Sequence, residues 1–557
     1  MTSTFIECGN HLNGKSQGEN GAIQFKSSSN DGLDLFFTLI RDCDTQQLES
    51  QLEKCIESDN PNEIADLFVL TFQTRNCRGG KGERKLFHVM ITTLFKFYPE
   101  TVINLLKLVP HYGYYKDYVF LLDMTYKNPF YKRFQEKIVD IIVEQLQADL
   151  TELDVSQVES RIPKLSLVAK YAPRPNKHYR RIAKLIYRKM YPCDIKAEEN
   201  YRKKLAIINK VLSTTEVNMC AKGYSQIQYS RVPSICLLKW RKAFLNERSN
   251  CPDSFFETGN RYPEDVDRVT SRNNLKEALK NKSISGKQLM PHEVVKEFMK
   301  NETTSIEEEL LTQQWEKMKE QVLLMIQSKN ENGLNLKNLV PLVDVSSSMN
   351  GLPMEVAISL GILVSEVTNP LFRDTFISFS TTPEWISLKG LTLKKKIEKT
   401  VNSPWGGSTD IMKAMKMIVD IVIMNKLTEN EIPDLIIFSD MQFDSADRNM
   451  SQHTTYEKIQ HLFISAGLEV CGKPYRTPRV IFWNLRATIG LPCDATTKDV
   501  QLISGFSPSL FKSVMNSDDI TPEGNYRTII DDEMYDEIRI ILKDSKENKL
   551  LHYNFIA

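Results

Sequence analysis

Apolar residues recur every three or four positions through the first 330 residues of the chain, which is the spacing of one face of an α-helix. Proline and glycine interrupt the pattern between these segments, so separate helices packed side by side are expected. The repeat is too irregular to assign to a named class, although a loose, HEAT-like array fits it. The clearest predicted helices cover residues 62–72, 85–97, 101–108, 134–146 and 201–212.

The pattern changes after about residue 330, where short apolar runs alternate with helical segments. Runs of the kind that are buried on both faces of a parallel sheet occupy residues 339–343, 375–379, 435–439 and 480–483. Helical spacing separates them at 354–368, 391–401 and 411–424. Strands alternating with helices predict a doubly wound, Rossmann-like α/β domain whose ligand crevice lies at the carboxyl ends of the strands.

Length and composition agree with a chain of several domains. The chain has 557 residues, of which 41% are hydrophobic and 26% charged, as in ordinary globular proteins. We therefore expect a flexible amino terminus (residues 1–18), an all-α helical array (19–330) and an α/β domain with closing helices (331–557). The oligomeric state stays open.

The sequence also bears on the compartment. No stretch approaches the roughly 18 consecutive apolar residues of a membrane span, and the amino terminus lacks a signal-peptide core. The ten cysteines are scattered, without a C-x-x-C pair, which favours neither a zinc site nor a disulfide framework. A cytoplasmic or nuclear protein without a membrane partner is expected.

Polar residues follow the predicted strands where a metal could be bound. Asp344, Ser346 and Ser348 come directly after the run 339–343, so a carboxylate and two hydroxyls can converge on one hard cation. Thr409 ends a Gly-rich loop before the helix predicted at 411–424, and Asp440 directly follows the run 435–439. Each residue alone also fits a helix cap or a turn. Together they predict a site for Mg2+ or Mn2+.

The pattern D-x-S-x-S, with a threonine and an aspartate downstream, resembles the metal-ion-dependent adhesion site of von Willebrand A domains. The resemblance implies that the serines and the threonine bind the metal directly or through water, and that the acids bind it directly or through its other ligands. It also implies a vacant coordination position for an acidic group on a protein partner. Metal-assisted binding is therefore expected rather than catalysis.

Two stretches extend the resemblance over most of the chain. Residues 75–84 and 111–117 each lie between predicted helices, and with residues 19–21 and 33–37 they are similar to an uncharacterised family. That family joins a helical half to a carboxyl-terminal von Willebrand A domain. The order of parts is also similar to the Ro autoantigen (TROVE) family, whose helical-repeat ring binds RNA, so the resemblance implies RNA binding as an alternative.

The Gly-rich run at residues 75–84 suggests a phosphate contact through Arg78 and Lys81, because glycines free backbone amides to face an anion. The run lacks the G-x-x-x-x-G-K-[ST] spacing of a phosphate-binding loop, and no predicted strand precedes it. A tight turn between two helices, with a solvated basic rim, is the alternative reading.

Charge is distributed unevenly along the chain. Residues 161–242 contain twenty Lys and Arg against four acids, a net charge of +16, whereas the whole chain carries +1 and the remainder therefore −15. Tyrosines are interleaved with these cations, a combination that suits phosphates and unpaired bases. A solvated helical face and an acidic protein partner remain alternatives. The candidate RNA contacts are Arg174, Lys177, Arg180, Arg181, Arg188 and Lys189.

Catalytic motifs such as H-E-x-x-H or G-x-S-x-G do not occur in the chain. We therefore expect a scaffold or binding protein rather than an enzyme, with a metal site that recognises an acidic group of a macromolecule. A Ro-like RNA-binding role of the helical half is the second hypothesis, and a metal-dependent hydrolase is the third.

Overall fold

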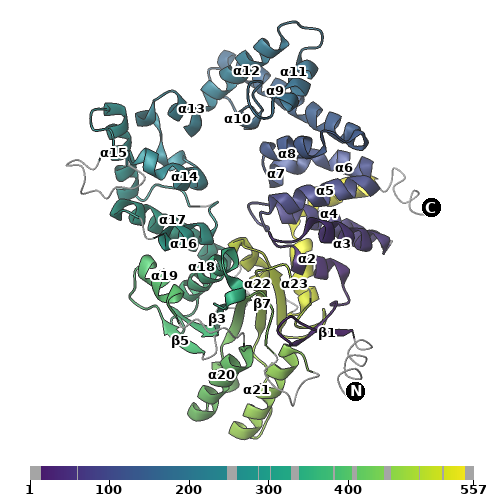
Figure 1. The fold of residues 1–557 in the computed structure, drawn as a ribbon, viewed down its shortest axis with the longest axis vertical. Helices are drawn as coiled ribbons and strands as arrows, with labels where there is room; N and C mark the ends of the chain where they lie inside the picture. Colours follow the sequence, from purple (N-terminus) through teal and green to yellow (C-terminus); the bar gives the residue numbers. More distant parts are fainter. Residues whose placement is uncertain are drawn as a thin grey trace.

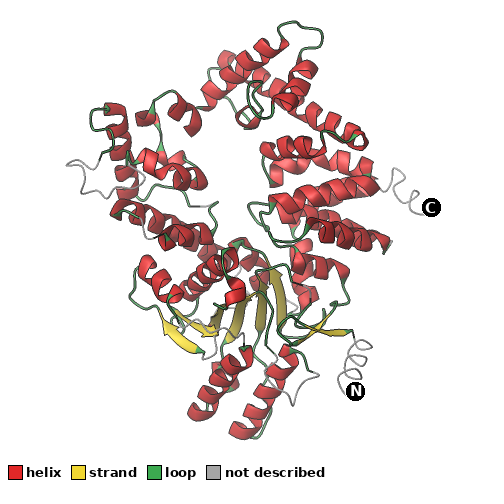
Figure 2. Cartoon of the chain, viewed as in Figure 1, coloured by secondary structure: helices red, strands yellow, loops and turns green. Residues whose placement is uncertain are grey.

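The chain folds into a helical half followed by a mixed six-stranded sheet with its own helices (Figure 2). The computed structural model describes residues 14–545 apart from residues 59, 248–259, 287, 301–302, 328–337, 380–382, 404–409, 445–452, 489 and 517–519. The coarse division predicted from hydrophobic periodicity is therefore confirmed. Within the described residues, none of the helices combines the length and the hydropathy that a membrane crossing requires.

The helical half forms because apolar stripes at helical spacing are buried between neighbouring helices. Its helices are α2 (Asp31–Thr38), α3 (Thr45–Glu57), α4 (Pro61–Arg75), α5 (Arg84–Phe97), α6 (Pro99–Leu105), α7 (Val109–Tyr112), α8 (Tyr115–Thr125), α9 (Lys132–Val158), α10 (Val168–Tyr171), α11 (Arg180–Met190), α12 (Ala197–Leu212), α13 (Thr215–Cys220), α14 (Ser234–Phe244), α15 (Val266–Lys280), α16 (Pro291–Met299) and α17 (Ser305–Gln327).

The sheet has the strand order β5-β4-β3-β6-β7-β8, and all its pairs are parallel except the edge pair β4–β5. Four of the strands were predicted, whereas β5 and β8 were not. The bounds are β3 (Leu339–Asp344), β4 (Thr375–Phe379), β5 (Glu384–Ser387), β6 (Asp434–Ser439), β7 (Val480–Asn484) and β8 (Val500–Ser504).

Helices connect and cover these strands. Helix α18 packs against β3, β4 and β6, and α16 and α17 of the helical half pack on α18 in turn. Helices α20 and α21 pack against each other at the bottom of the view in Figure 1. The bounds are α18 (Leu352–Val367), α19 (Leu393–Val401), α20 (Ile411–Asn425), α21 (Thr455–Cys471), α22 (Phe511–Asn516), α23 (Pro522–Ile530) and α24 (Asp536–Ser545).

The two halves of the chain interlock. Helix α2, near the amino terminus, packs on β8 and α23, while α24, near the carboxyl terminus, packs on α4 and α6 of the helical half. The helices thus follow a closed path, which leaves the sheet at α2 and returns to it through α16 (Figure 1). One continuous hydrophobic core runs through both halves, and a smaller one fills the space around α14 and α15.

The first described residues form a separate two-stranded sheet that lies against the sheet domain rather than the helical array. Strands β1 (Lys15–Gln17) and β2 (Ile23–Phe25) form an antiparallel hairpin, whereas a flexible segment was predicted up to residue 18. Backbone bridges join Gly21 to Asp444, Ile23 to Thr454 and Phe25 to Leu491. The hairpin therefore lies against the loops that follow β6 and β7. Residues 1–13 lie outside the described part of the chain.

Candidate metal centre

The predicted acids meet where the strand order of the sheet reverses. Strands β3 and β6 are parallel neighbours, but the chain continues from β3 toward β4 on one side and from β6 toward β7 on the other. In open α/β sheets this switch point opens a crevice at the carboxyl ends of the strands. Asp344 is the last residue of β3, and Asp440 directly follows β6. The topology thus brings together two carboxylates that are far apart in sequence.

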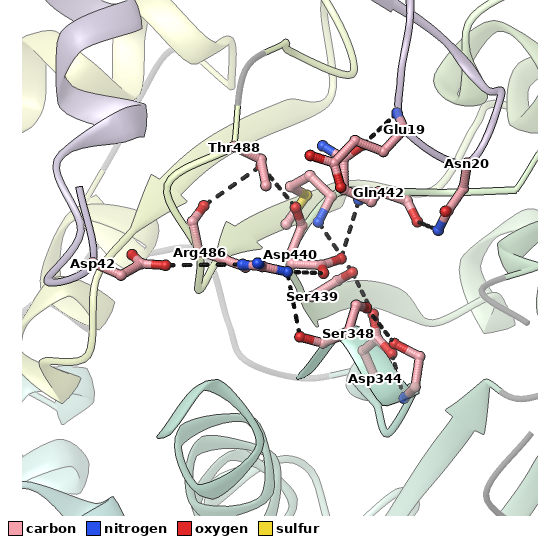
Figure 3. A network of polar contacts seen from close by, with 12 residues as sticks. Glu19, Asn20, Asp42, Asp344, Ser348, Ser439, Asp440, Gln442, Arg486 and Thr488 are labelled. Carbon is pink, nitrogen blue, oxygen red and sulfur yellow. Dashed lines mark hydrogen bonds and ion pairs between the residues drawn. The ribbon is translucent and has the colours of Figure 1, made fainter. Parts of the chain in front are cut away.

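Asp344 is fully buried and is held by hydrogen bonds from the loop after β3 and from the end of β6. The backbone N–H of Ser346 donates to Asp344 Oδ1 at 2.9 Å, and Ser439 Oγ donates to Asp344 Oδ2 at 2.6 Å. The hydroxyls of Ser346 and Ser348 lie 3.0 Å apart. Figure 3 shows Asp344 with Ser348 and Ser439 beside it. These contacts fix the carboxylate and place two hydroxyl oxygens beside it.

Asp440 is also fully buried, but only one of its carboxylate oxygens is hydrogen-bonded. Oδ1 accepts the backbone N–H of Gln442 at 3.2 Å. Among the described residues, no hydrogen bond reaches Oδ2, and the guanidinium of Arg486 is 3.9 Å from it. A buried carboxylate oxygen without a donor is costly unless a cation or a water approaches it. This oxygen is therefore free to bind a further group.

The electrostatics of the two acids favour the approach of a cation. Burial, reinforced by the negative charge of Asp440, raises the pKa of Asp344 to about 7, against the hydrogen bonds from Ser439 and Ser346. Burial likewise raises the pKa of Asp440, while the hydroxyl of Ser348 and the guanidinium of Arg486 oppose the rise. A divalent cation between the two carboxylates would offset both the cost of burying their negative charges and the repulsion between them.

The donor set fits a hard cation that prefers oxygen. Two carboxylates and two hydroxyls suit Mg2+ or Mn2+, with water filling the remaining positions. The described residues contain no cluster of three or more His, Cys, Asp and Glu side chains, so hydroxyls and water have to supply much of the coordination. Asp344, Ser346, Ser348 and Asp440 would hold the ion. The predicted ligand Thr409 lies outside the described residues, and its neighbour Asp410 caps α20 by accepting the backbone N–H of Lys413.

Several side chains around the two acids were not predicted. Ser439 and Arg486 follow the same rule as the predicted ligands, since each lies at the carboxyl end of a strand, β6 or just beyond β7. Arg486 also lies 4.0 Å from Asp42 of the α2–α3 connection. Thr488 supports the loop, because its hydroxyl donates to the carbonyl of Asp440 at 2.8 Å. The position of Asp42 could not be found from sequence, since it depends on how α2 packs on the sheet.

The Gly-rich loop between α4 and α5 does not present Lys81 to a phosphate. Lys81 is fully buried and its ammonium donates to the carbonyls of Phe36 and Leu39, at 2.5 and 2.9 Å, and to Ser504 Oγ at 2.6 Å. All three donors are used, so the predicted phosphate contact at Lys81 is wrong. Arg78 is exposed and donates to the carbonyl of His111.

The glycines of this loop are explained by packing. A Cβ atom on Gly80 would lie 2.0 Å from the backbone oxygen of Gln73, and Gly82 has a positive φ of 74°. Both positions therefore exclude larger residues for reasons of backbone geometry. The loop is a tight connection between two helices, which was the alternative reading.

The basic segment presents some of its predicted cations to solvent. Lys177, Arg180, Arg181, Arg188 and Lys189 are exposed, whereas Arg174 is half-buried and burial lowers its pKa. Lys189 forms an ion pair with Asp140 at 2.7 Å. The tyrosines at 187 and 201 are core residues, so they are closed to base stacking. The segment is therefore a cationic face, on which Tyr171, Tyr179 and Tyr191 are half-buried and Trp240 is exposed.

Comparisons with known proteins divide the chain in the same place as the fold. A family described as "Domain of unknown function (DUF2828)" matches residues 18–128 and 118–325, and one described as "Domain of unknown function (DUF7788)" matches residues 338–553. Neither a von Willebrand A nor a TROVE family matches the chain. The chain is similar to "Uncharacterized protein L728" of Acanthamoeba polyphaga mimivirus, with 29% identity over 522 residues that cover 90% of this chain and 85% of the relative.

Proposed function

The chain belongs to the DUF2828 family, whose description names no activity, and we propose from its site that it is a binding protein whose sheet domain recognises an acidic group with the help of a divalent cation. The observation that carries the proposal is the pairing of Asp344 and Asp440 at the switch point, both buried, with one carboxylate oxygen unbonded. The pairing supports a cation site because isolated buried carboxylates are otherwise unfavourable.

We further propose that this is a von Willebrand A-type domain. The strands, numbered in chain order within the domain, run 3-2-1-4-5-6, with an antiparallel edge strand, and the D-x-S-x-S loop leaves the first of them. In this reading Asp344, Ser346, Ser348 and Asp440 hold Mg2+ or Mn2+, and Thr409 would join them. The cation supplies a positive charge with exchangeable water positions, one of which a carboxylate of the partner takes.

Binding rather than hydrolysis is favoured by the surroundings of the acids. Arg486 is the cation that pairs with Asp440, and a guanidinium donates hydrogen bonds without accepting any, so it is unsuited to act as a general base. It can instead orient an incoming carboxylate through paired N–H donors. The site therefore suits recognition of a planar acidic group.

A displayed library of random peptides tests this function. Selection in Mg2+ should enrich peptides that contain Asp or Glu, and elution with EDTA should release them. The Asp344→Asn variant should enrich none of them. Enrichment that is the same with EDTA, or in the variant, would refute cation-dependent recognition.

A second candidate function is RNA binding by the helical half. The observation that favours it is a set of exposed cations on α11 and α12 that form no ion pair within the described residues: Arg180, Lys184, Arg202 and Lys204. Such cations leave phosphates as suitable counter-charges. Tyr187 and Tyr201 are buried and closed to base stacking, so the contact would rest chiefly on the phosphates of the nucleic acid.

A further inference from the structure

A cavity lies where the first helices of the chain meet the last helices of the sheet domain. Its volume is about 460 Å3, within the range of roughly 300–1,000 Å3 that is usual for small-molecule sites. Residues 27–32, α3 and α4 line it from the amino-terminal half, and α23 lines it from the carboxyl-terminal half. Helix α23 packs on both α2 and α4, so the cavity spans the junction of the two halves (Figure 1).

The charged residues around the cavity are mostly acidic. Among the described residues, four carboxylates and one guanidinium line it: Asp31, Glu63, Asp66, Glu523 and Arg527. Arg527 forms an ion pair with Asp66, and Lys54 forms one with Asp31 at 2.8 Å. Glu63 and Glu523 are exposed, and within the described part of the chain neither of them forms an ion pair. The cavity therefore keeps two negative charges, one on each half of the chain, that a cationic ligand would balance.

The hydroxyl group of Tyr526 is buried at the floor of the cavity. The side chain is 1% exposed, and among the described residues its hydroxyl has no acceptor. The guanidinium of Arg527 lies 5.2 Å from the centre of the Tyr526 ring, but a guanidinium donates hydrogen bonds and accepts none. Burial raises the pKa of Tyr526 far above its usual value, so the hydroxyl keeps its proton. A buried donor without an acceptor is unfavourable, and an acceptor atom of a ligand would satisfy it.

Gly32 brings this hydroxyl to the wall of the cavity. A Cβ atom on Gly32 would lie 2.5 Å from Tyr526 Oη, so the missing side chain is what lets α2 approach the hydroxyl. Leu67 and Cys55 are the other buried residues of the lining, and burial raises the pKa of the Cys55 thiol to about 12. The floor is therefore uncharged, whereas the rim is acidic.

We propose that this cavity binds a small hydroxylated amine, such as an amino alcohol or an amino sugar. Its ammonium group pairs with Glu63 and Glu523, and one of its oxygen atoms accepts the hydrogen bond of Tyr526. Ser29 and Asn30 of the lining are polar partners for further hydroxyls. The site is separate from the cation site at the sheet edge and does not depend on it. Because the ligand contacts both halves of the chain, its binding stabilises their junction.

Isothermal titration calorimetry of the full chain tests the site with ethanolamine, serinol and glucosamine, each beside its N-acetyl derivative. N-acetylation removes the positive charge and keeps the hydroxyls. At least one amine should bind about tenfold or more tightly than its N-acetyl derivative, and it should raise the unfolding temperature.

Paired substitutions test the acidic rim. Changing Glu63 and Glu523 together to Gln should weaken binding of the amine about tenfold or more, because the ammonium loses both carboxylates. Changing Glu57 and Glu384 to Gln is the matched control, since both are exposed acids outside the cavity, and it should leave the affinity unchanged. An equal loss in the two double variants would contradict the assignment.

Tyr526→Phe separates binding from folding. It removes a buried hydroxyl that has no acceptor, so the unliganded variant should be at least as stable as the wild type, while its affinity for the amine falls about tenfold. A less stable variant would show that the hydroxyl is bonded within the protein, which would refute the proposal. Binding of none of the amines, equal binding of the N-acetyl derivatives, or unchanged affinity in Tyr526→Phe would also refute it.

Discussion

Lys81 Nζ lies 2.6 Å from Ser504 Oγ, and this contact joins the loop between α4 and α5 to the last residue of β8. The same ammonium donates to two carbonyls of the α2 region, and burial holds its pKa well below the usual value for lysine. One side chain therefore ties together the helical half, helix α2 and the sheet. It explains why the Gly-rich loop carries a lysine whose side chain is turned into the core.

Replacing Lys81 by Met should destabilise the protein by about 3 kcal/mol or more, because three buried acceptors lose their donor. Denaturant unfolding followed by circular dichroism measures the loss. Lys85→Met, an exposed change four residues away, should cost less than about 0.5 kcal/mol. Equal unfolding midpoints for the two variants would show that Lys81 does not join the two halves.

Neighbouring glycines of this loop should respond differently to alanine. A methyl group on Gly80 would lie 2.0 Å from the backbone oxygen of Gln73, whereas on Gly79 it would meet the flexible end of Met534. Gly80→Ala should therefore cost about 2 kcal/mol or more, and Gly79→Ala less than about 1 kcal/mol. Thermal unfolding compares them. If Gly79→Ala is the more damaging change, the described loop geometry is wrong.

The continuous apolar runs predicted four of the six strands because those strands are buried on both faces. Strand β8 was missed because Gln501, which is fully buried, interrupts its apolar run. Strand β5 was missed because it is a short edge strand with an exposed glutamate. Acids at strand ends could be predicted, since parallel strands end at one edge. The partners of Lys81 could not, because Ser504 is 423 residues away.

In the basic segment, the sequence pattern does not determine whether the tyrosine rings face solvent or the core. Tyrosine and cation alternate there whether the rings face solvent or the core, and only packing decides. Tyr187 and Tyr201 turned inward because they recur at the spacing of the buried face. The cations are exposed to solvent, which both interpretations of the segment, an RNA-binding face and a solvated helical face, predict.

The stability of the protein should fall in acid through His292 of α16. Burial lowers the pKa of His292 from 6.5 to about 3, and its ring packs against Phe506. Below pH 6.5 the unfolded chain gains a proton that the folded chain does not. The stabilising contribution of the buried neutral His292 to the free energy of unfolding is thus complete above pH 6.5. It is lost as the pH falls toward 3, by up to about 1.4 kcal/mol per pH unit.

Unfolding midpoints of the wild type and His292→Gln, measured from pH 7 to pH 4, isolate this contribution. The difference between the two proteins should shrink as the pH falls, because glutamine does not titrate. A constant difference between wild type and His292→Gln would contradict the assignment.

RNA binding by the basic face should depend on salt. If phosphates contact α11, changing Arg180 and Lys184 to Glu should weaken binding of a single-stranded RNA and lower the slope of log affinity against log salt by about 0.7 per lost contact. Lys389 and Lys473, exposed on the sheet domain, provide a control pair for the same change. A flat salt dependence in the wild type would exclude a phosphate interface.

Direct titration with Mn2+, followed by the paramagnetic signal of the free ion, tests the central claim. The wild type should bind one ion per chain at this site. Asp344→Asn and Asp440→Asn should each bind Mn2+ about a hundredfold or more weakly, because each replaces a carboxylate of the site. Both variants should keep the fold, because each change removes the repulsion between two buried acids. Asp420→Asn, on the exposed face of α20, should bind as the wild type does. No saturable site in the wild type, or unchanged affinity in Asp344→Asn, would contradict the account.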